Sequence, residues 1–326
     1  MVPVYLASLR ARHSEKVSYI GGIGGVVGWG ARIFRAAGSS ALVSVVGSPP
    51  LTYSEDQLAN VFLAAELGLP MSVASGVAIG ANAPATLAGS LVQTYAEIAA
   101  AFTLAQTVRP GMSCMASDYS QPFDMRTGGV VQGGIERGLM GAAWAQLWRT
   151  QRVPCITRIS SDAKVPDYQC AMEKVMAVTV QALAGSSIVN FLGGVYDELV
   201  ISPVVAVMDN DVAHMVGRLL DGVRVDRESL AVDTIEDVGP VPGHYLDRAH
   251  TRDTWRKEQL IPDLPYLLPY GDWLKGGKKD ILALTREKYE HIAATHHPAP
   301  LTADQDAEID AIVEEARAHY RAKGLA

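Results

Sequence analysis

The sequence contains few cysteines and no block of basic residues. Its three cysteines, Cys114, Cys155 and Cys170, are widely spaced, which argues against a disulfide framework and against a structural zinc site. We expect them to be free, buried thiols in a reducing compartment. The formal net charge is −7 and the lysines and arginines are dispersed, so neither a nucleic-acid partner nor an anionic membrane surface is expected.

Long apolar runs are also absent. No stretch of about 20 uninterrupted apolar residues is present, so no membrane span is predicted. Residues 1–12 lack the continuous apolar segment of a secretory signal peptide, and the default expectation is a cytoplasmic protein. Aromatic residues make up only 7%, whereas hydrophobic residues make up 48%. The apolar residues are mostly Ala, Val, Leu and Ile, which favours helices layered on a sheet over a β-sandwich.

Several common catalytic signatures are missing as well. The sequence has no Gly-x-x-x-x-Gly-Lys-Ser/Thr phosphate loop and no pattern typical of a Ser-His-acid or Cys-His nucleophile. The glycine cluster at 21–25 does not fit the Gly-x-Gly-x-x-Gly spacing of a dinucleotide site. His296 and His297 stand beside Pro298, and we interpret them as exposed loop residues and not as metal ligands.

The sequence does contain a repeated alternation of short apolar runs and amphipathic helices. In the clearest unit, residues 42–47 are predicted to form a strand, and Ser54 with Gln57 has the spacing of a capping box at the start of a helix. Gly68 ends that helix, and Pro70 prevents its continuation. Similar patterns predict strands at 16–20, 71–74, 112–116, 153–159, 187–192 and 199–201, and helices at 84–108, 136–150, 167–184 and 204–220.

Strands that alternate with helices in this way predict an α/β fold with a parallel sheet. The near-even spacing of the units and the lack of a nucleotide fingerprint favour a TIM-type (β/α) barrel over an open doubly wound sheet. We assign residues 1–275 to the barrel and residues 276–326 to a C-terminal helical extension, with helices at 281–295 and 304–323. The extension is expected to pack on the barrel or on another subunit, which leaves a homo-oligomer open.

Acidic and aromatic residues follow several of the predicted strands. In a parallel barrel the residues just after the strands line one mouth. Acidic groups and ring faces suit a cationic ligand, because a quaternary ammonium has no N–H group to donate. Two simpler interpretations stay open, namely that Asp162 caps the helix that follows it and that Arg126 forms a surface ion pair. The residues placed near this mouth are Asp118, Tyr119, Asp124, Asp162, Tyr196 and Glu198.

Six segments of this sequence match, in order and spacing, the pattern of a known family. They are Ser48-Pro49-Pro50-Leu51, residues 80–89, Tyr95-Ala96-Glu97, Phe123-Asp124-Met125-Arg126, residues 161–169 and residues 238–251. Each segment is weak alone, but together, over residues 2–264, they resemble the trimethylamine/glycine-betaine corrinoid methyltransferase family.

The resemblance implies a (β/α) barrel that moves a methyl group from a small methylated amine to the cobalt of a separate corrinoid protein. That partner carries the cobalamin, so the resemblance implies no tightly bound cofactor and no metal in this chain. The trimethylamine enzymes of the family use pyrrolysine, and no such residue stands in this sequence. Members without pyrrolysine are associated with quaternary amines such as glycine betaine.

Family members usually carry a further ~150 residues before the point that matches Val2, a length near that of one ordinary domain. Those residues include the first strands of the barrel. We therefore expect a barrel that is incomplete at its N-terminus. Another chain completes it, the start of the chain is truncated, or the barrel of this member is reduced.

The resemblance and the strand-end positions together suggest roles for individual residues. Asp162 and Glu198 are expected to offset the ammonium charge, Tyr119 and Tyr196 to face the methyl groups, and Lys164 or Arg126 to meet a substrate carboxylate. The catalytic candidates are thus Asp162, Glu198 and Lys164, and the substrate-binding candidates are Asn82, Asp118, Tyr119, Arg126, Asn190 and Tyr196. The alternatives are a non-catalytic amine-binding or assembly subunit and a methyltransferase with a folate acceptor.

Overall fold

The computed structural model describes residues 1–196, 198–264 and 267–324. The chain divides into two compact units. Unit 1 contains residues 1–191, residues 195–200 and the chain from residue 292 onward, and unit 2 contains residues 192–194 and 201–291.

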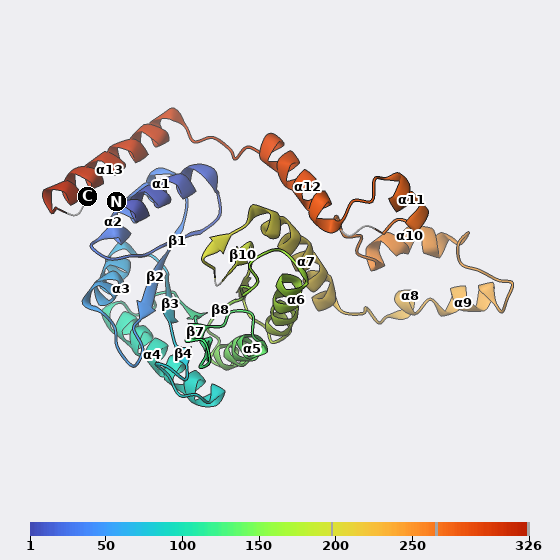
Figure 1. Cartoon of the computed structure of the whole chain (residues 1–326), viewed down its shortest axis with the longest axis horizontal. Coiled ribbons are helices and arrows are strands. Elements are labelled where there is room, and N and C mark those ends of the chain that lie inside the picture. Colours follow the sequence, from blue (N-terminus) through green and yellow to red (C-terminus); the bar gives the residue numbers. More distant parts are fainter. Residues whose placement is uncertain (197, 265–266, 325–326) are drawn as a thin grey trace. The chain divides into compact units, whose positions relative to one another are not determined.

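Unit 1 is built on a six-stranded parallel sheet with the order β1-β2-β3-β5-β8-β9. Figure 1 shows that this sheet curls, with helices around its outside. The strands are β1 (Ser18–Ile20), β2 (Ala41–Gly47), β3 (Met71–Ser75), β5 (Cys114–Asp118), β8 (Cys155–Arg158) and β9 (Ile188–Asn190). Within the described residues, β1 and β9 each pair with a single neighbour, so the sheet is an open half-barrel. The prediction of a parallel α/β fold is confirmed, and the architecture is that of a partial TIM-like barrel.

Three of the helices outside the sheet, α3, α4 and α6, begin at residues whose side chains cap them. The side chains of Ser54, Thr86 and Asp167 each accept a hydrogen bond from a backbone N–H in the first turn of a helix. Gly68 ends α3 in the left-handed conformation, with φ of 70°. Gln57 does not complete a capping box, because its side-chain oxygen accepts a 2.9 Å hydrogen bond from Val46 N in β2. The helices are α2 (Val26–Ala36), α3 (Glu55–Leu67), α4 (Leu87–Val108), α5 (Ile135–Thr150) and α6 (Tyr168–Leu183).

The outer face of the sheet and the helices that cover it form the hydrophobic core. Alternate strand residues such as Val43, Val45, Val73 and Ala116 are completely buried against the helices. Trp144 of α5 is also fully buried in this core. Because side chains alternate between the two faces of a strand, the residues between these positions lie on the inner face of the curl.

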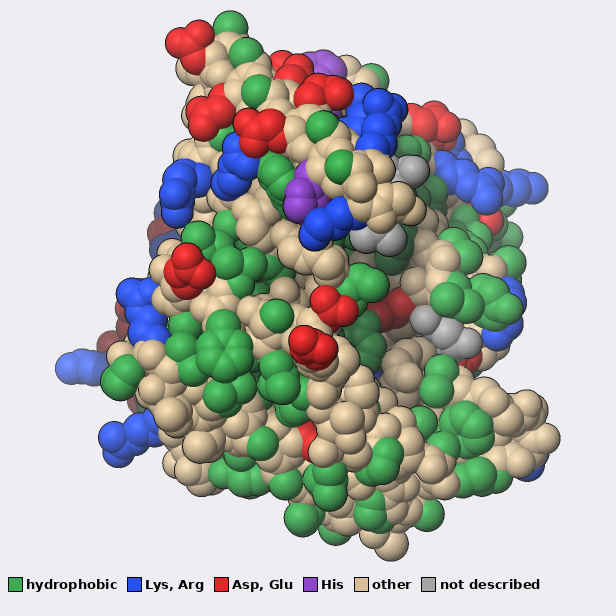
Figure 2. Space-filling view, turned by 90° about the vertical axis from the view of Figure 1, so that its left-hand side faces the viewer, with side chains coloured by type: hydrophobic (Ala, Val, Ile, Leu, Met, Phe, Trp, Pro, Cys, Tyr) green, Lys and Arg blue, Asp and Glu red, His purple; other side chains and the backbone are tan. Residues whose placement is uncertain are grey.

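The two ends of the chain meet on unit 1, at the β1 edge of the sheet. Helices α1 (Val2–His13) and α13 (Ala303–Ala322) pack on each other and on α2. Tyr320 donates a 2.8 Å hydrogen bond to Gly24 O, and Arg12 contacts Asp306 at 2.5 Å. Figure 2 shows acidic side chains gathered at the top of the molecule, where α13 lies. The helix predicted at 304–323 is therefore confirmed, whereas the sequence patterns did not predict α1 or α2.

Two smaller sheets lie outside the six-stranded sheet. One contains β4 (Ala78–Ile79), β6 (Gln121–Asp124) and β7 (Gly129–Val130), so the segments that follow β3 and β5 pair with each other. The other contains β10 (Gly194–Val195) and β11 (Val200–Ile201). The strand predicted at 199–201 is thus not a further strand of the main sheet.

Unit 2 is mostly helical. Buried Asp211 of α7 accepts a 2.7 Å hydrogen bond from Leu264 N, and Lys288 of α12 contacts Asp263 at 2.7 Å. These polar contacts join helices that bury few apolar residues. The helices are α7 (Pro203–Asp221), α8 (Arg227–Leu230), α9 (Val232–Val238), α10 (Ala249–Glu258), α11 (Tyr270–Lys275) and most of α12 (Ile281–Thr295). Among the helices of the described residues, none is long and apolar enough to cross a membrane.

The packing of α13 on unit 1 can be tested with Ile309, which is fully buried. The substitution Ile309→Ala should lower the free energy of unfolding by about 2–5 kcal/mol, because it removes buried methyl groups and leaves a cavity. Urea unfolding followed by circular dichroism measures this change. The exposed neighbour Glu308 serves as the control, and Glu308→Ala should change stability by less than about 0.5 kcal/mol. Equal effects of the two substitutions would contradict the docking of α13.

Candidate functional site

The inner face of the curled sheet is polar near the carboxyl ends of the strands. Asp118 at the end of β5 forms a buried ion pair with Arg137 of α5, so its side chain points outward, toward the helices. Ser117 and Tyr119 on either side of it therefore point inward. TIM-barrel interiors are usually filled with branched apolar side chains, so polar residues in this position indicate a site for a ligand or water.

Arg158 lies on this inner face, at the end of β8. Its guanidinium carbon lies 4.5 Å from the centre of the Tyr119 ring, and Nη1 donates a 3.4 Å hydrogen bond to the Tyr119 hydroxyl. Tyr19 of β1 approaches the same region although β1 and β8 are not neighbours in the sheet. Burial raises the pKa of Tyr19, while the charge of Arg158 and a hydrogen bond with Ser72 lower it in part. The curl of the sheet thus brings β1, β3, β5 and β8 together through their side chains.

Several buried polar atoms in this region have no hydrogen-bond partner among the described residues. They are the hydroxyls of Ser117, Ser120 and Ser160 and the Nε atom of Arg158. Buried polar groups in proteins are nearly always hydrogen-bonded. A cluster of unpaired donors at the ends of β5 and β8 therefore indicates that a ligand or water molecules complete their bonding.

Asp118 was predicted to bind substrate, and the structure gives its carboxylate two other partners. One oxygen pairs with Arg137, and the other accepts a 2.9 Å hydrogen bond from Ser120 N. Both members of the ion pair are only 1% exposed. The pair fixes the turn after β5 and so holds Tyr119 in place.

Asp162 accepts 3.0 Å hydrogen bonds from the backbone N–H groups of Gln132 and Gly133, which precede α5. Its own N–H donates a 2.9 Å hydrogen bond to Glu173. The interpretation of Asp162 as a helix cap is wrong, because Asp167 caps α6. Asp162 instead ties the loop after β8 to the start of α5.

Lys164 and Tyr196 lie together on the neighbouring loops. The Lys164 ammonium is 4.8 Å from the centre of the Tyr196 ring and donates a 2.6 Å hydrogen bond to Asp162 O. Tyr196 N donates a 3.1 Å hydrogen bond to Ala163 O, which joins the loop after β9 to the loop after β8. Tyr196 and Glu198 have positive φ values of 48° and 61°. Asp197 between them lies outside the described residues.

Two of the remaining predicted residues, Arg126 and Asn82, have other partners. Arg126 lies in the turn between β6 and β7, is 88% exposed and forms two 2.9 Å hydrogen bonds with Asp124. This is the surface ion pair of the simpler interpretation. Asn82 accepts a 2.6 Å hydrogen bond from Ala78 N and shapes the loop after β3. Asn190 ends β9 and is the register partner of Arg158 on the neighbouring strand, and its side chain is exposed.

Glu97 is a buried carboxylate that the site prediction missed. Its side chain accepts hydrogen bonds from the Ser75 hydroxyl at the end of β3 and, at 2.8 Å, from Leu51 N. The Tyr53 hydroxyl donates a 2.9 Å hydrogen bond to Glu97 O, and burial together with the Glu97 charge raises the Tyr53 pKa. Glu97 belongs to Tyr95-Ala96-Glu97, one of the six segments that match the family, and this match could have indicated it as a site residue. Arg158 and Tyr19 were missed because they lie within strands, whereas the site prediction considered only residues that follow the strands.

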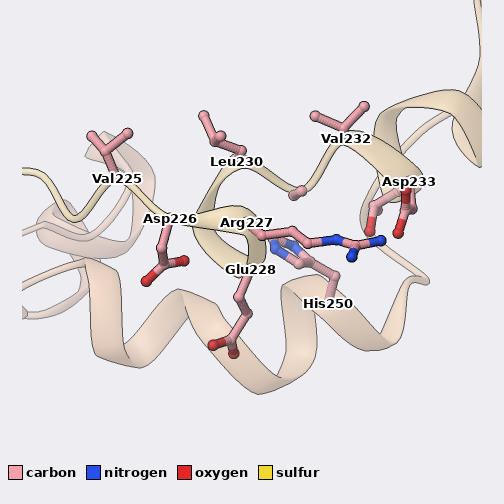
Figure 3. Close-up of a pocket in the computed structure, with 10 residues that line it drawn as sticks. Val225, Asp226, Arg227, Glu228, Leu230, Val232, Asp233 and His250 are labelled. Atoms are coloured by element: carbon pink, nitrogen blue, oxygen red, sulfur yellow. The ribbon is translucent and has the colours of Figure 1, made fainter.

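A cavity of about 800 Å³ lies in unit 2, and none of these residues lines it. Figure 3 shows Val225, Leu230 and Val232 on one side of the backbone and Asp226 and Glu228 on the other. These side chains are exposed, and exposed charges hold ligands weakly. In the part of the chain that the structure describes, no group of three or more His, Cys, Asp or Glu side chains is arranged to hold a metal ion.

The model of the family described as trimethylamine methyltransferase (MTTB) matches residues 30–320 of this sequence. The chain belongs to the trimethylamine methyltransferase family. A trimethylamine methyltransferase from Methanosarcina barkeri is 34% identical over 278 residues, which is 83% of this chain and 55% of the relative. A glycine betaine methyltransferase from Desulfitobacterium hafniense is 32% identical over 277 residues, which is 84% of this chain and 57% of the relative. The chain thus spans about half the length of the curated relatives that it matches. The resemblance drawn from the six segments is confirmed.

The exposed pair of Asp124 and Arg126 gives a test of the local geometry. Hydrogen bonds from Arg126 lower the pKa of Asp124 from 3.8 to about 2. The pair therefore contributes to stability above pH 3.8, and the contribution is lost as the pH falls through about 2. In Arg126→Ala the pKa of Asp124 should return toward 3.8, as measured by an NMR titration of its carboxyl carbon. An unchanged pKa would show that the bidentate contact does not form.

Proposed function

We propose that this chain carries the substrate site of a methyltransferase that moves a methyl group from a quaternary amine such as glycine betaine to the cobalt of a partner corrinoid protein. The family match over residues 30–320 carries this proposal, because it includes the ends of β2, β3, β5, β8 and β9. The cobalamin belongs to the partner, which we treat as the methyl acceptor and second substrate.

The reaction does not require an acidic or basic group of the protein. The C–N bond breaks with its electron pair on nitrogen, and a new bond forms between the methyl carbon and the acceptor. A quaternary ammonium leaves as a neutral tertiary amine, so no proton has to be donated to it. The tasks of the chain are to hold the amine, to align the methyl group with the acceptor and to exclude water.

The loops after β8 and β9 provide a suitable position for the ammonium group. The Tyr196 ring already faces one ammonium, that of Lys164, at 4.8 Å. We propose that the substrate ammonium displaces Lys164 from this ring, since the face of an aromatic ring attracts a cation. Asp162 stands two residues before Lys164, and Glu198 stands two residues after Tyr196. Their carboxylates offset the positive charge of the substrate ammonium.

A direct assay separates this function from its alternatives. The purified chain is incubated with glycine betaine and a reduced corrinoid protein, and dimethylglycine is measured by mass spectrometry. We expect dimethylglycine only when both are present, and trimethylamine as the donor provides the comparison. Binding of glycine betaine without dimethylglycine would favour a non-catalytic subunit, and turnover with folate in place of the corrinoid protein would favour the folate acceptor.

Tyr196 can be tested with a matched pair of substitutions. Tyr196→Phe keeps the ring face and should change the affinity for glycine betaine by less than about threefold, whereas Tyr196→Leu should weaken it by roughly 3- to 30-fold, as expected for loss of a cation–π contact. Isothermal titration calorimetry measures both. Equal affinities of the Phe and Leu variants would place the ammonium elsewhere.

A further inference from the structure

Arg158 differs from the other arginine close to it in having no acidic partner. Arg137 is fully buried and neutralised by Asp118. Arg158 is half-buried, and within the described residues its contacts are the ring and the hydroxyl of Tyr119. Its Nε atom, like that of Arg137, is buried and has no hydrogen-bond partner among the described residues. A buried N–H group without a partner is costly, and a guanidinium without a carboxylate keeps its full positive charge, so an anion suits this position.

The groups around Arg158 are also suited to an anion. The Tyr119 hydroxyl lies 3.4 Å from Nη1 of this guanidinium. The hydroxyl of Ser160, two residues beyond Arg158, is buried and unpaired within the described part of the chain. Hydroxyl groups donate to anions readily, and a planar guanidinium matches the two oxygens of a carboxylate.

We propose that Arg158, together with the hydroxyl of Tyr119, binds the carboxylate of the substrate and so selects methylated amines that carry a carboxylate. This inference rests on the proposed function, and it replaces Lys164 and Arg126 as the carboxylate partner. Arg126 is bound to Asp124 on an exposed turn, and the Lys164 ammonium is bound to Asp162 O. Arg158 ends β8, and the loop that follows this strand carries Lys164, which lies next to Tyr196.

The carboxylate subsite predicts a difference between ligands that share a trimethylammonium group. Calorimetry on the whole chain should show that wild type binds glycine betaine at least about tenfold more tightly than choline, which has no carboxylate. Arg158→Gln should weaken the binding of glycine betaine by about 10- to 100-fold and change that of choline by less than about threefold. Arg158→Lys keeps the charge but not the planar fork, and its affinity for glycine betaine should fall between those of wild type and Arg158→Gln.

Matched controls guard against a general loss of structure. Arg149→Gln removes an exposed arginine of α5 and should leave both affinities unchanged. The melting temperature and circular dichroism of each variant show whether it folds. Phosphocholine tests the kind of anion, and tighter binding of phosphocholine than of glycine betaine would overturn the carboxylate assignment. Equal losses for glycine betaine and choline in folded Arg158→Gln, or no loss for either, would also overturn the subsite.

The result is separable from that of the methyl-transfer assay. Arg158-dependent binding of glycine betaine without dimethylglycine formation supports the subsite and contradicts the proposed reaction. Formation of dimethylglycine at the wild-type rate and affinity by Arg158→Gln supports the reaction and contradicts the subsite. If wild type binds neither glycine betaine nor choline, the subsite is contradicted as well.

Discussion

The alternation of side chains along the parallel strands is the constraint on which unit 1 depends. Each strand presents one set of residues to the helices outside and the other set to the inside of the curl. The outer set, which includes Val43, Val73 and Ala116, is apolar and buried, and it fixes the sheet to its helices. The inner set is therefore free to be polar, and near the strand ends it contains Tyr19 and Arg158.

The strand ends are held by polar contacts that run outward, away from the inner face. The Asp118–Arg137 pair anchors the end of β5, and Glu97 binds the end of β3 and the turn after β2. Asp162 anchors the loop after β8 to the start of α5. These carboxylates position the loops, and their hydrogen bonds are made within the fold. The unpaired donors of the inner face are therefore the groups that a ligand can bind. A methyl-transfer site that works by positioning and water exclusion needs this kind of rigid frame.

The local patterns of the sequence predicted much of the fold because they report local physics. The β-branched run before Gly47, the cap at Ser54 and the left-handed Gly68 each act within a few residues. The patterns missed α1 and α2, whose helices are held by packing against α13 from the other end of the chain. The role of Asp162 as a cap was wrong for a similar reason, since its partners at 132 and 133 come from another loop.

By itself the sequence determined the alternation of strands and helices, the family and the polar character of the strand ends. Only the tertiary structure decided which of those polar residues converge. Asp118 and Arg126 have partners of opposite charge close by, whereas Arg158 of β8 meets Tyr119, which follows the neighbouring strand β5. The physical reason is that charge pairing and burial depend on distances between strands, and the curvature of the sheet sets those distances.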